Sequence, residues 1–363
     1  MSEIQDRVQH HIETLVDAGA ETGVQVAVHQ DGALVVDEVA GAADPATGRP
    51  LTSGTPIFGF SVAKNVTATL AHLLVARGFL EYDSPVTDLW PEFGAHGKAT
   101  ATLRHVLTHT VGIPAMPREI TPAELPDWSS VCAALAGAAP RWRPGAATGY
   151  HSYTFGFLVG ELARRATGRP VHELLHEWTT APLGLEGQLF YGVPEEALAG
   201  LARLEQRSRD RPADPEDAGA VLAPWESRPS AVLGNDAAVL RADIPSVGTA
   251  TARGLAAMYD AVLQGGLVGP ARLEELSAVA FEGVDQVFGT PARMALGFPV
   301  GRIGALAGEG AVAFGWPGGG GSYAYADPAR GVAFALTKTR LVPSFDTVLS
   351  VVRILDDHLA GAG

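Results

Sequence analysis

The strand-forming runs of this chain lie near its two ends, and this distribution constrains the fold more than any other feature. Near the N-terminus, the β-rich run 24–28 is followed by Asp31-Gly32 and by a second such run, 34–36. An Asp-Gly pair between two β-rich runs is typical of an antiparallel hairpin. A further apolar run, 331–336, lies close to the C-terminus. We therefore expect one sheet that is built from both ends of the chain.

Helical patterns occupy most of the remaining sequence. The apolar residues of segment 3–18 recur at the spacing of an amphipathic helix. Apolar periodicity bounded by Pro and Gly predicts further helices at 61–77, 103–107, 123–136, 154–166, 171–179, 250–263 and 343–358. An N-terminal helix followed by an antiparallel hairpin favours a mixed fold over a purely parallel sheet.

The expected fold class is therefore α/β of the α+β kind, with a central, mainly antiparallel sheet flanked by helices and an inserted helical domain. We place the sheet domain at 1–75 and 235–363, and the mostly helical insertion at 76–234. Within the insertion, segment 202–230 is charged and Pro-rich, which is typical of a surface loop. We expect this excursion to line a binding site.

Composition limits the classes of partner and location. The formal net charge of −14 disfavours nucleic acid and anionic membranes, because no basic footprint is available. Cys132 is the only cysteine, which excludes an intramolecular disulfide, and its apolar neighbours predict a buried thiol. Neither a signal-peptide pattern nor about 18 uninterrupted apolar residues occur, so we expect a cytoplasmic protein with no membrane association. No pattern indicates an oligomeric state.

The first motif whose side chains could carry out a reaction is Ser61-Val62-Ala63-Lys64, at the start of a predicted helix. The i to i+3 spacing places both side chains on one helical face, so the amine lies within reach of the hydroxyl. Serine is a poor nucleophile until its proton is removed, and a lysine can remove it when burial lowers the amine pKa. Taken alone, this spacing also arises by chance.

The second motif is Gly149-Tyr150-His151-Ser152, which precedes the predicted helix at 154–166. A tyrosine hydroxyl near a cationic lysine can have its pKa lowered enough to act as a base and then as an acid. The alternative for Tyr150 is a residue at a helix start that packs on the core.

The third motif is the glycine-rich segment 315–322, Gly-Trp-Pro-Gly-Gly-Gly-Gly-Ser. Glycines let the backbone approach a substrate closely and direct N–H groups at an oxyanion. A phosphate-binding loop is the competing interpretation. It is disfavoured because no Lys-Ser or Lys-Thr follows the glycines.

Together the three motifs resemble those of the penicillin-recognising, serine β-lactamase-like superfamily. Its members include class C-type β-lactamases, D-alanyl-D-alanine peptidases and family VIII carboxylesterases. Further segments resemble the same proteins, in the same order and across nearly the whole chain: 78–86, 89–91, 102–114, 143–145, 156–168 and 182–185.

The resemblance implies a β-lactamase/transpeptidase-like fold with an active site between the two domains. It implies Ser61 as nucleophile and Lys64 and Tyr150 as the groups that move its proton. The backbone N–H groups of Ser61 and Gly319 would form the oxyanion hole, because Gly319 follows the triplet that begins at Trp316. No metal or organic cofactor is implied. The expected substrate-binding residues are His151, Ser152, Trp316 and Gly318.

Two departures from the family pattern bear on the substrate. β-Lactamases and peptidases carry Tyr-x-Asn where this chain has Tyr150-His151-Ser152, and usually Lys-Thr-Gly where it has Trp316-Pro317-Gly318. Family VIII esterases often carry Trp or His at that first position, so Trp316 resembles them more closely. A lysine there can pair with a substrate carboxylate, whereas Trp316 offers an apolar wall. We therefore expect a small neutral ester, amide or thioester, with a β-lactamase or D-amino-acid peptidase as the alternative.

Three alternatives belong to other classes. His172-Glu173-Leu174-Leu175-His176 matches the zinc-hydrolase pattern His-Glu-x-x-His, although no extended zinc motif follows. The segment 59–63 approximates the Gly-x-Ser-x-Gly turn of α/β-hydrolases, a fold that the antiparallel hairpin disfavours. A non-catalytic binding protein on the same scaffold is the third. The similarly spaced His105 and His109 are interpreted as structural.

Overall fold

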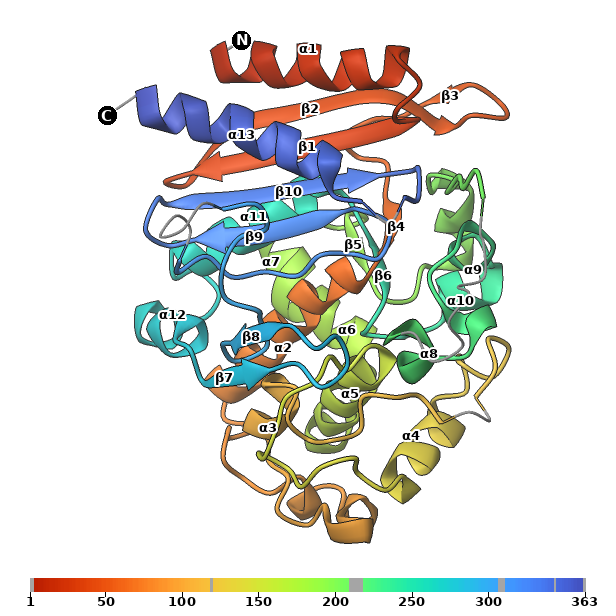
Figure 1. Cartoon of the computed structure of the whole chain (residues 1–363), viewed down its shortest axis with the longest axis vertical. Coiled ribbons are helices and arrows are strands. Elements are labelled where there is room, and N and C mark those ends of the chain that lie inside the picture. The colour runs from red at the N-terminus through yellow and green to blue at the C-terminus, as the bar shows by residue number, and fades with distance from the viewer. Residues whose placement is uncertain (1–2, 118–119, 209–217, 306–310, 343, 362–363) are drawn as a thin grey trace.

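The structure is a computed structural model that describes residues 3–117, 120–208, 218–305, 311–342 and 344–361. One antiparallel sheet joins the two ends of the chain (Figure 1). Its strands, in spatial order, are β3 (Arg49–Pro50), β2 (Ala33–Asp44), β1 (Gly23–Gln30), β10 (Val332–Lys338) and β9 (Tyr323–Asp327). The α/β fold class is thereby confirmed, and the α/β-hydrolase alternative is wrong because that fold needs a mainly parallel sheet.

The central strand β1 pairs with one strand from each end of the chain. Val26 lies opposite Glu38 of β2 on one side and Leu336 of β10 on the other. The turn between β1 and β2 has positive φ at both Asp31 (49°) and Gly32 (86°). Positive φ at two adjacent residues matches the twist of a tight hairpin. The predicted hairpin and the predicted C-terminal strand are both confirmed.

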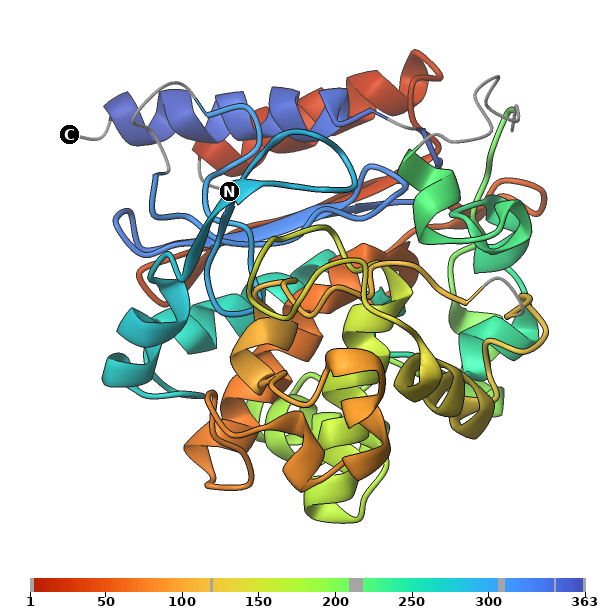
Figure 2. The ribbon, with the colours of Figure 1, turned by 60° about the horizontal axis from the view of Figure 1, so that its bottom comes forward.

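Helices cover both faces of this sheet. On one face, α1 (Glu3–Asp17) and α13 (Asp346–Gly361) lie side by side (Figures 1 and 2). Their apolar stripes and the adjoining strand residues form a separate core that includes Ile12, Val26 and Val351. On the other face, α11 (Ala252–Leu263) packs against β1, β9 and β10. That side belongs to the larger core of the molecule.

Two smaller pairings lie outside the main sheet. A three-stranded sheet has the order β4 (Ile57–Phe60), β6 (Gly248–Ala250) and β5 (Leu189–Phe190). A hairpin is formed by β7 (Phe281–Val284) and β8 (Pro291–Met294). Both matter for the site, because β4 leads directly into Ser61 and the β7–β8 turn lies beside Tyr150.

The remaining helices gather on the side of the sheet away from the terminal helices (Figure 1). At their centre, α5 is buried from Tyr153 to Ala163 and packs against α2. Their bounds are α2 (Lys64–Ala76), α3 (Leu103–Leu107), α4 (Trp128–Gly137), α5 (Tyr153–Thr167), α6 (Val171–Leu175), α7 (Ala181–Leu183), α8 (Ala218–Leu222), α9 (Ala231–Gly234), α10 (Ala237–Arg241) and α12 (Pro270–Ser277).

One predicted helix begins later than expected, and two others are helical as expected but contain a turn of another kind. The helix expected at 123–136 begins at Trp128, because the Asp127 carboxylate accepts from the Ser130 N–H and caps it there. The helix expected at 171–179 changes to a π-turn over His176–Thr180. The helix expected at 61–77 opens with a 3₁₀ turn over Ser61–Ala63.

Other predictions concern burial and the surface loop. Cys132 is buried, as expected. No helix in the described part of the chain is both long enough and apolar enough to cross a membrane. Part of the predicted excursion 202–230, residues 209–217, lies outside the described residues.

Candidate active site

Ser61 stands at a sharp turn between β4 and α2. The preceding residue, Phe60, is almost fully buried and has φ 52° and ψ −127°, a conformation that bulky residues rarely adopt. Gly59 lacks room for a side chain, since a Cβ there would lie 2.4 Å from Val62 Cγ1. The strained turn places the Ser61 hydroxyl at the wall of a cavity.

The structure brings Ser61, Lys64 and Tyr150 together. Lys64 Nζ lies 2.9 Å from Ser61 Oγ, and Tyr150 Oη lies 2.6 Å from the same oxygen. Lys64 Nζ also donates to the Ser246 carbonyl at 3.1 Å and lies 5.1 Å from the centre of the Tyr150 ring. All three side chains can therefore exchange protons through hydrogen bonds without rearrangement.

Burial sets the protonation of this group. Lys64 is fully buried, and burial holds the pKa of its amine well below its usual range. No carboxylate is paired with Nζ among the described residues, so nothing there restores the charged form. Burial therefore favours the uncharged form of the amine that lies beside Ser61.

The expected lowering of the Tyr150 pKa is wrong. Burial, with a smaller contribution from the charge of Asp285, raises the pKa of Tyr150 to about 12, although hydrogen bonds with Ser61 and Ser152 work in the opposite direction. The expectation relied on a cationic lysine, whereas burial disfavours the cation on Lys64. Tyr150 is therefore a protonated hydroxyl that can relay a proton.

Ser246 is a part of the site that the sequence did not reveal. Its carbonyl accepts from Lys64, and its hydroxyl accepts from the N–H of Gly156 at 2.8 Å. A Cβ on Gly156 would lie 2.2 Å from Ser246 N, so only glycine lets α5 approach this segment. The one available signal was a glycine inside an apolar helix pattern.

The glycine-rich segment lies directly against the Ser61 turn. Asn65 holds it there, because Asn65 Oδ1 accepts from Trp316 N at 2.7 Å and Asn65 Nδ2 donates to Trp316 O at 3.2 Å. A Cβ on Gly318 would lie 2.1 Å from the Gly59 carbonyl oxygen. Within the described residues, the Gly319 N–H donates to no carbonyl. Ser61 and Gly319 thus border the same cavity from facing segments.

His109 fixes the loop that carries Tyr150. Its carbonyl accepts from Gly149 N at 3.1 Å, and its Nδ1 accepts from His151 N at 2.8 Å. The ring is stacked between Tyr150 (5.8 Å, 16°) and Phe155 (4.8 Å, 5°). Burial and the charges of His151 and Lys64 hold its pKa well below its usual range. The structural role expected for His109 therefore includes direct support of Tyr150.

Of the four predicted substrate-binding residues, three line the cavity and one does not. Ser152, Trp316 and Gly318 lie in its wall. His151 instead points into the core, where Nε2 accepts from Ile113 N at 3.1 Å and Nδ1 lies 2.6 Å from the Gly149 carbonyl oxygen. Its expected contact with substrate is a wrong prediction, because alternation along the loop turns the side chain after Tyr150 away from the cavity.

The cavity in front of Ser61 has a volume of about 280 Å³ and a mainly apolar wall. As predicted, the excursion 202–230 contributes to it, through residues between 219 and 229. Two further segments add Phe288 and Phe345. The apolar and aromatic side chains in its wall include Tyr153, Leu222, Ala223, Pro229, Phe288, Trp316, Pro317 and Phe345.

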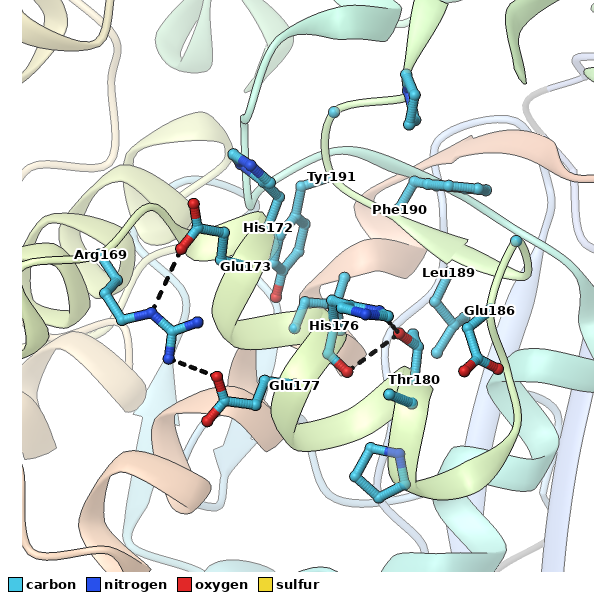
Figure 3. Close-up of a pocket in the computed structure, with 16 residues that line it drawn as sticks. Arg169, His172, Glu173, His176, Glu177, Thr180, Glu186, Leu189, Phe190 and Tyr191 are labelled. Atoms are coloured by element: carbon cyan, nitrogen blue, oxygen red, sulfur yellow. Dashed lines mark hydrogen bonds and ion pairs between the residues drawn. The ribbon is translucent and has the colours of Figure 1, made fainter. Parts of the chain in front are cut away.

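The His-Glu-x-x-His segment borders a different cavity, of about 720 Å³ (Figure 3). Its two histidines do not converge: His172 Nδ1 lies 3.0 Å from Asp243 Oδ2, and His176 Nδ1 lies 3.3 Å from Thr180 Oγ1. Glu173 is engaged by the guanidinium of Arg169 (Figure 3). In the described part of the chain, no three His, Cys, Asp or Glu side chains are placed to hold a metal ion. The donor set for a zinc hydrolase is therefore not assembled here.

Comparisons with known proteins agree with this geometry. The β-lactamase family profile matches residues 8–356. The chain is 36% identical over 344 residues to the esterase/beta-lactamase LipL of Mycobacterium tuberculosis, covering 88% of this chain and 77% of LipL.

Solved structures give the same result. A penicillin-binding protein homologue from Caulobacter crescentus is 33% identical, with a TM-score of 0.87 over 99% of this chain and 98% of the homologue. A family VIII carboxylesterase is 28% identical, with a TM-score of 0.88 over 98% of each chain. With a family match that spans nearly the whole sequence, the chain belongs to the β-lactamase family and is a hydrolase of the serine β-lactamase fold.

Proposed function

We propose that this protein acts on small neutral esters, amides or thioesters through an acyl-enzyme on Ser61, as a carboxylesterase-like hydrolase or transacylase. The observation that carries the proposal is the fully buried Lys64 amine, 2.9 Å from the Ser61 hydroxyl. A deprotonated lysine at hydrogen-bond distance from a serine is the arrangement that makes the serine a nucleophile.

In the proposed reaction, Lys64 takes the Ser61 proton while Oγ attacks the acyl carbon. The carbonyl oxygen becomes an oxyanion that is stabilised by the N–H groups of Ser61 and Gly319. As the tetrahedral intermediate collapses, Tyr150 gives its hydroxyl proton to the leaving oxygen, nitrogen or sulfur, the bond from the acyl carbon to that atom breaks, and Tyr150 takes back the proton held by Lys64. Water, an alcohol or an amine then attacks the acyl-enzyme by the reverse proton path and restores Ser61.

The aromatic and aliphatic part of the cavity wall favours neutral, apolar acyl groups, and the one cationic side chain in its described lining, Arg228, donates to the Ala223 carbonyl. Trp316 stands where many relatives carry a lysine, and its indole N–H is already donated to the Gly297 carbonyl at 2.6 Å. It therefore presents an aromatic face and no positive charge. A volume of about 280 Å³ fits a short or medium acyl chain. LipL, the esterase/beta-lactamase relative, supports an esterase assignment and motivates β-lactams as a second class of test substrate.

The decisive experiment combines active-site labelling with turnover. The protein is exposed to a fluorophosphonate and, separately, to p-nitrophenyl butyrate, with and without a zinc chelator, and the labelled peptide is mapped by mass spectrometry. We expect one adduct at Ser61, no adduct in Ser61→Ala, and ester hydrolysis that is indifferent to the chelator. The variant Ser129→Ala, at an exposed serine on α4 that does not line the cavity, is the matched control and should keep both the Ser61 adduct and the ester hydrolysis.

Two results would reject the proposal. An unreactive Ser61 in a folded protein would favour a binding protein, and chelator-sensitive turnover would favour the zinc alternative. Adding a short alcohol and measuring the new ester separates acyl transfer from hydrolysis. A β-lactam tested in the same format measures the alternative activity.

A further inference from the structure

The carboxylate of Asp285 lies between the loop that carries Tyr150 and the β7–β8 turn that carries Phe288. Its Oδ2 accepts the backbone N–H of Tyr150 at 2.9 Å. Its Oδ1 accepts two N–H groups of its own turn, from Val287 at 2.7 Å and Phe288 at 2.9 Å. One side chain therefore fixes both a reacting residue and a residue of the cavity wall.

Backbone contacts also join the Tyr150 loop to the β7–β8 turn. Thr148 and Asp285 form a parallel β-bridge, and Gln286 N donates to the Thr148 carbonyl at 2.9 Å. Val287 packs against Gly149, where a Cβ would lie 3.3 Å from Val287 Cγ2. The turn and the Tyr150 loop thus form one unit, in which only Asp285 supplies a side-chain acceptor to both.

Phe288 is the part of this unit that lines the cavity in front of Ser61. Its ring lies 5.7 Å from the Tyr150 ring. About half of its surface is exposed, so packing with other core residues does not fix its position. The turn that holds Phe288 is closed by backbone hydrogen bonds from Asp285 N to the Thr290 carbonyl and from Gly289 N to the Asp285 carbonyl, and the Asp285 carboxylate adds the two N–H groups that it accepts.

We propose that Asp285 is a positioning residue that couples the placement of Tyr150 to the shape of the acyl pocket through Phe288. The proposal rests on the proposed Ser61 acyl-enzyme. It assigns to one carboxylate an effect on turnover and an effect on acyl-chain selectivity. Its loss moves the tyrosine hydroxyl relative to Ser61 and releases the wall formed by Phe288.

Substitutions at Asp285 separate these effects. Asp285→Ala removes both carboxylate oxygens that accept these N–H groups. We expect kcat for p-nitrophenyl acetate to fall on the order of 10- to 100-fold, because displacing a proton-transfer group by up to about 1 Å has an effect of this size. The selectivity, measured as kcat/KM for p-nitrophenyl hexanoate divided by kcat/KM for p-nitrophenyl acetate, should change several-fold. Asp285→Asn keeps one acceptor oxygen and should show a smaller change in at least one of the two quantities. Glu282→Gln, on β7 and paired only with Arg293 at the surface, is the matched control and should match wild type.

A double-variant comparison tests the route of the coupling. If selectivity is set through Phe288, Asp285→Ala should alter the hexanoate-to-acetate ratio in the wild-type background and leave it unchanged in the Phe288→Ala background. A further change there overturns the coupling. So does an Asp285→Ala protein, folded by circular dichroism, that keeps kcat and the ratio within twofold of wild type. Absence of a Ser61 adduct in the wild-type protein would instead reject the proposed function, before any variant is made.

Discussion

Gly318→Ala tests how closely the glycine-rich segment must approach the Ser61 turn. The added Cβ would lie 2.1 Å from the Gly59 carbonyl oxygen, whereas ordinary van der Waals contact begins at 3.4 Å. The two segments must therefore separate by about 1 Å to admit one methyl group. Gly59 is two residues before Ser61, and Gly318 is one residue before Gly319, so the displacement widens the proposed oxyanion hole.

The expected magnitude follows from this geometry. Loss of one oxyanion donor lowers kcat about 10²- to 10³-fold, or about 2.7–4 kcal/mol, and a misplacement of about 1 Å lowers rates about 10²-fold. We expect a decrease in kcat of about 10²- to 10³-fold for p-nitrophenyl butyrate. The decrease in kcat/KM should be similar, because the lost interaction forms only in the transition state.

Steady-state kinetics should be paired with urea denaturation, because the same overlap also lowers the free energy of unfolding. Gly137→Ala is the matched control: a Cβ at Gly137 meets no atom within 4 Å, and the residue lies on α4, away from the cavity. A folded Gly318→Ala protein that keeps more than a tenth of wild-type kcat would refute the idea that the close contact between Gly318 and Gly59 positions the oxyanion donors.

Two further predictions concern the groups around Ser61. Because the reaction needs deprotonated Lys64, whose pKa burial lowers well below its usual range, kcat/KM should fall as the pH decreases through that lowered pKa. Lys64→Ala should lower kcat about as much as Ser61→Ala and should remove this acidic limb of the pH–rate profile. A Lys64→Ala protein that keeps the limb and near-normal rates would contradict the assignment. His109→Phe keeps an aromatic ring beside Tyr150 but leaves the backbone N–H of His151 unpaired. We expect urea denaturation to show a loss of about 1–3 kcal/mol in unfolding free energy, and ester hydrolysis to show a kcat about 10-fold lower. An unchanged kcat would argue against the support of Tyr150 by His109.

The parts of the fold and site that could be predicted are those with short-range signals. The Asp31-Gly32 turn identifies its hairpin because the turn chemistry is local. Ser61 and Lys64 share a helical face at a spacing of three residues, so the helix itself brings them together. Family motifs then connected them to Tyr150, whose hydroxyl lies 2.6 Å from Ser61 Oγ.

The parts that could not be predicted depend on long-range contacts or on burial. The Ser246 carbonyl meets Lys64 from 182 positions away, and Asp285 meets Tyr150 from 135 positions away, with no pattern in either segment to mark them. The resemblance places His151 in the tyrosine motif and predicts contact with substrate, yet the loop turns its ring into the core. The pKa of Tyr150 rises because of its surroundings, which residue type alone does not reveal.

The sheet that joins both ends of the chain also orders events during synthesis. Gln25 on β1 accepts a hydrogen bond from Thr337 on β10, 312 residues later in the sequence. At about 5–20 residues per second, the ribosome needs roughly 15 to 60 s to deliver that partner. Throughout this interval the β1–β2 hairpin presents an unpaired edge in the nascent chain, which is the kind of surface that associates with other strands. Completion of the sheet, and with it the approach of the glycine-rich segment to Ser61, is therefore among the last steps of folding.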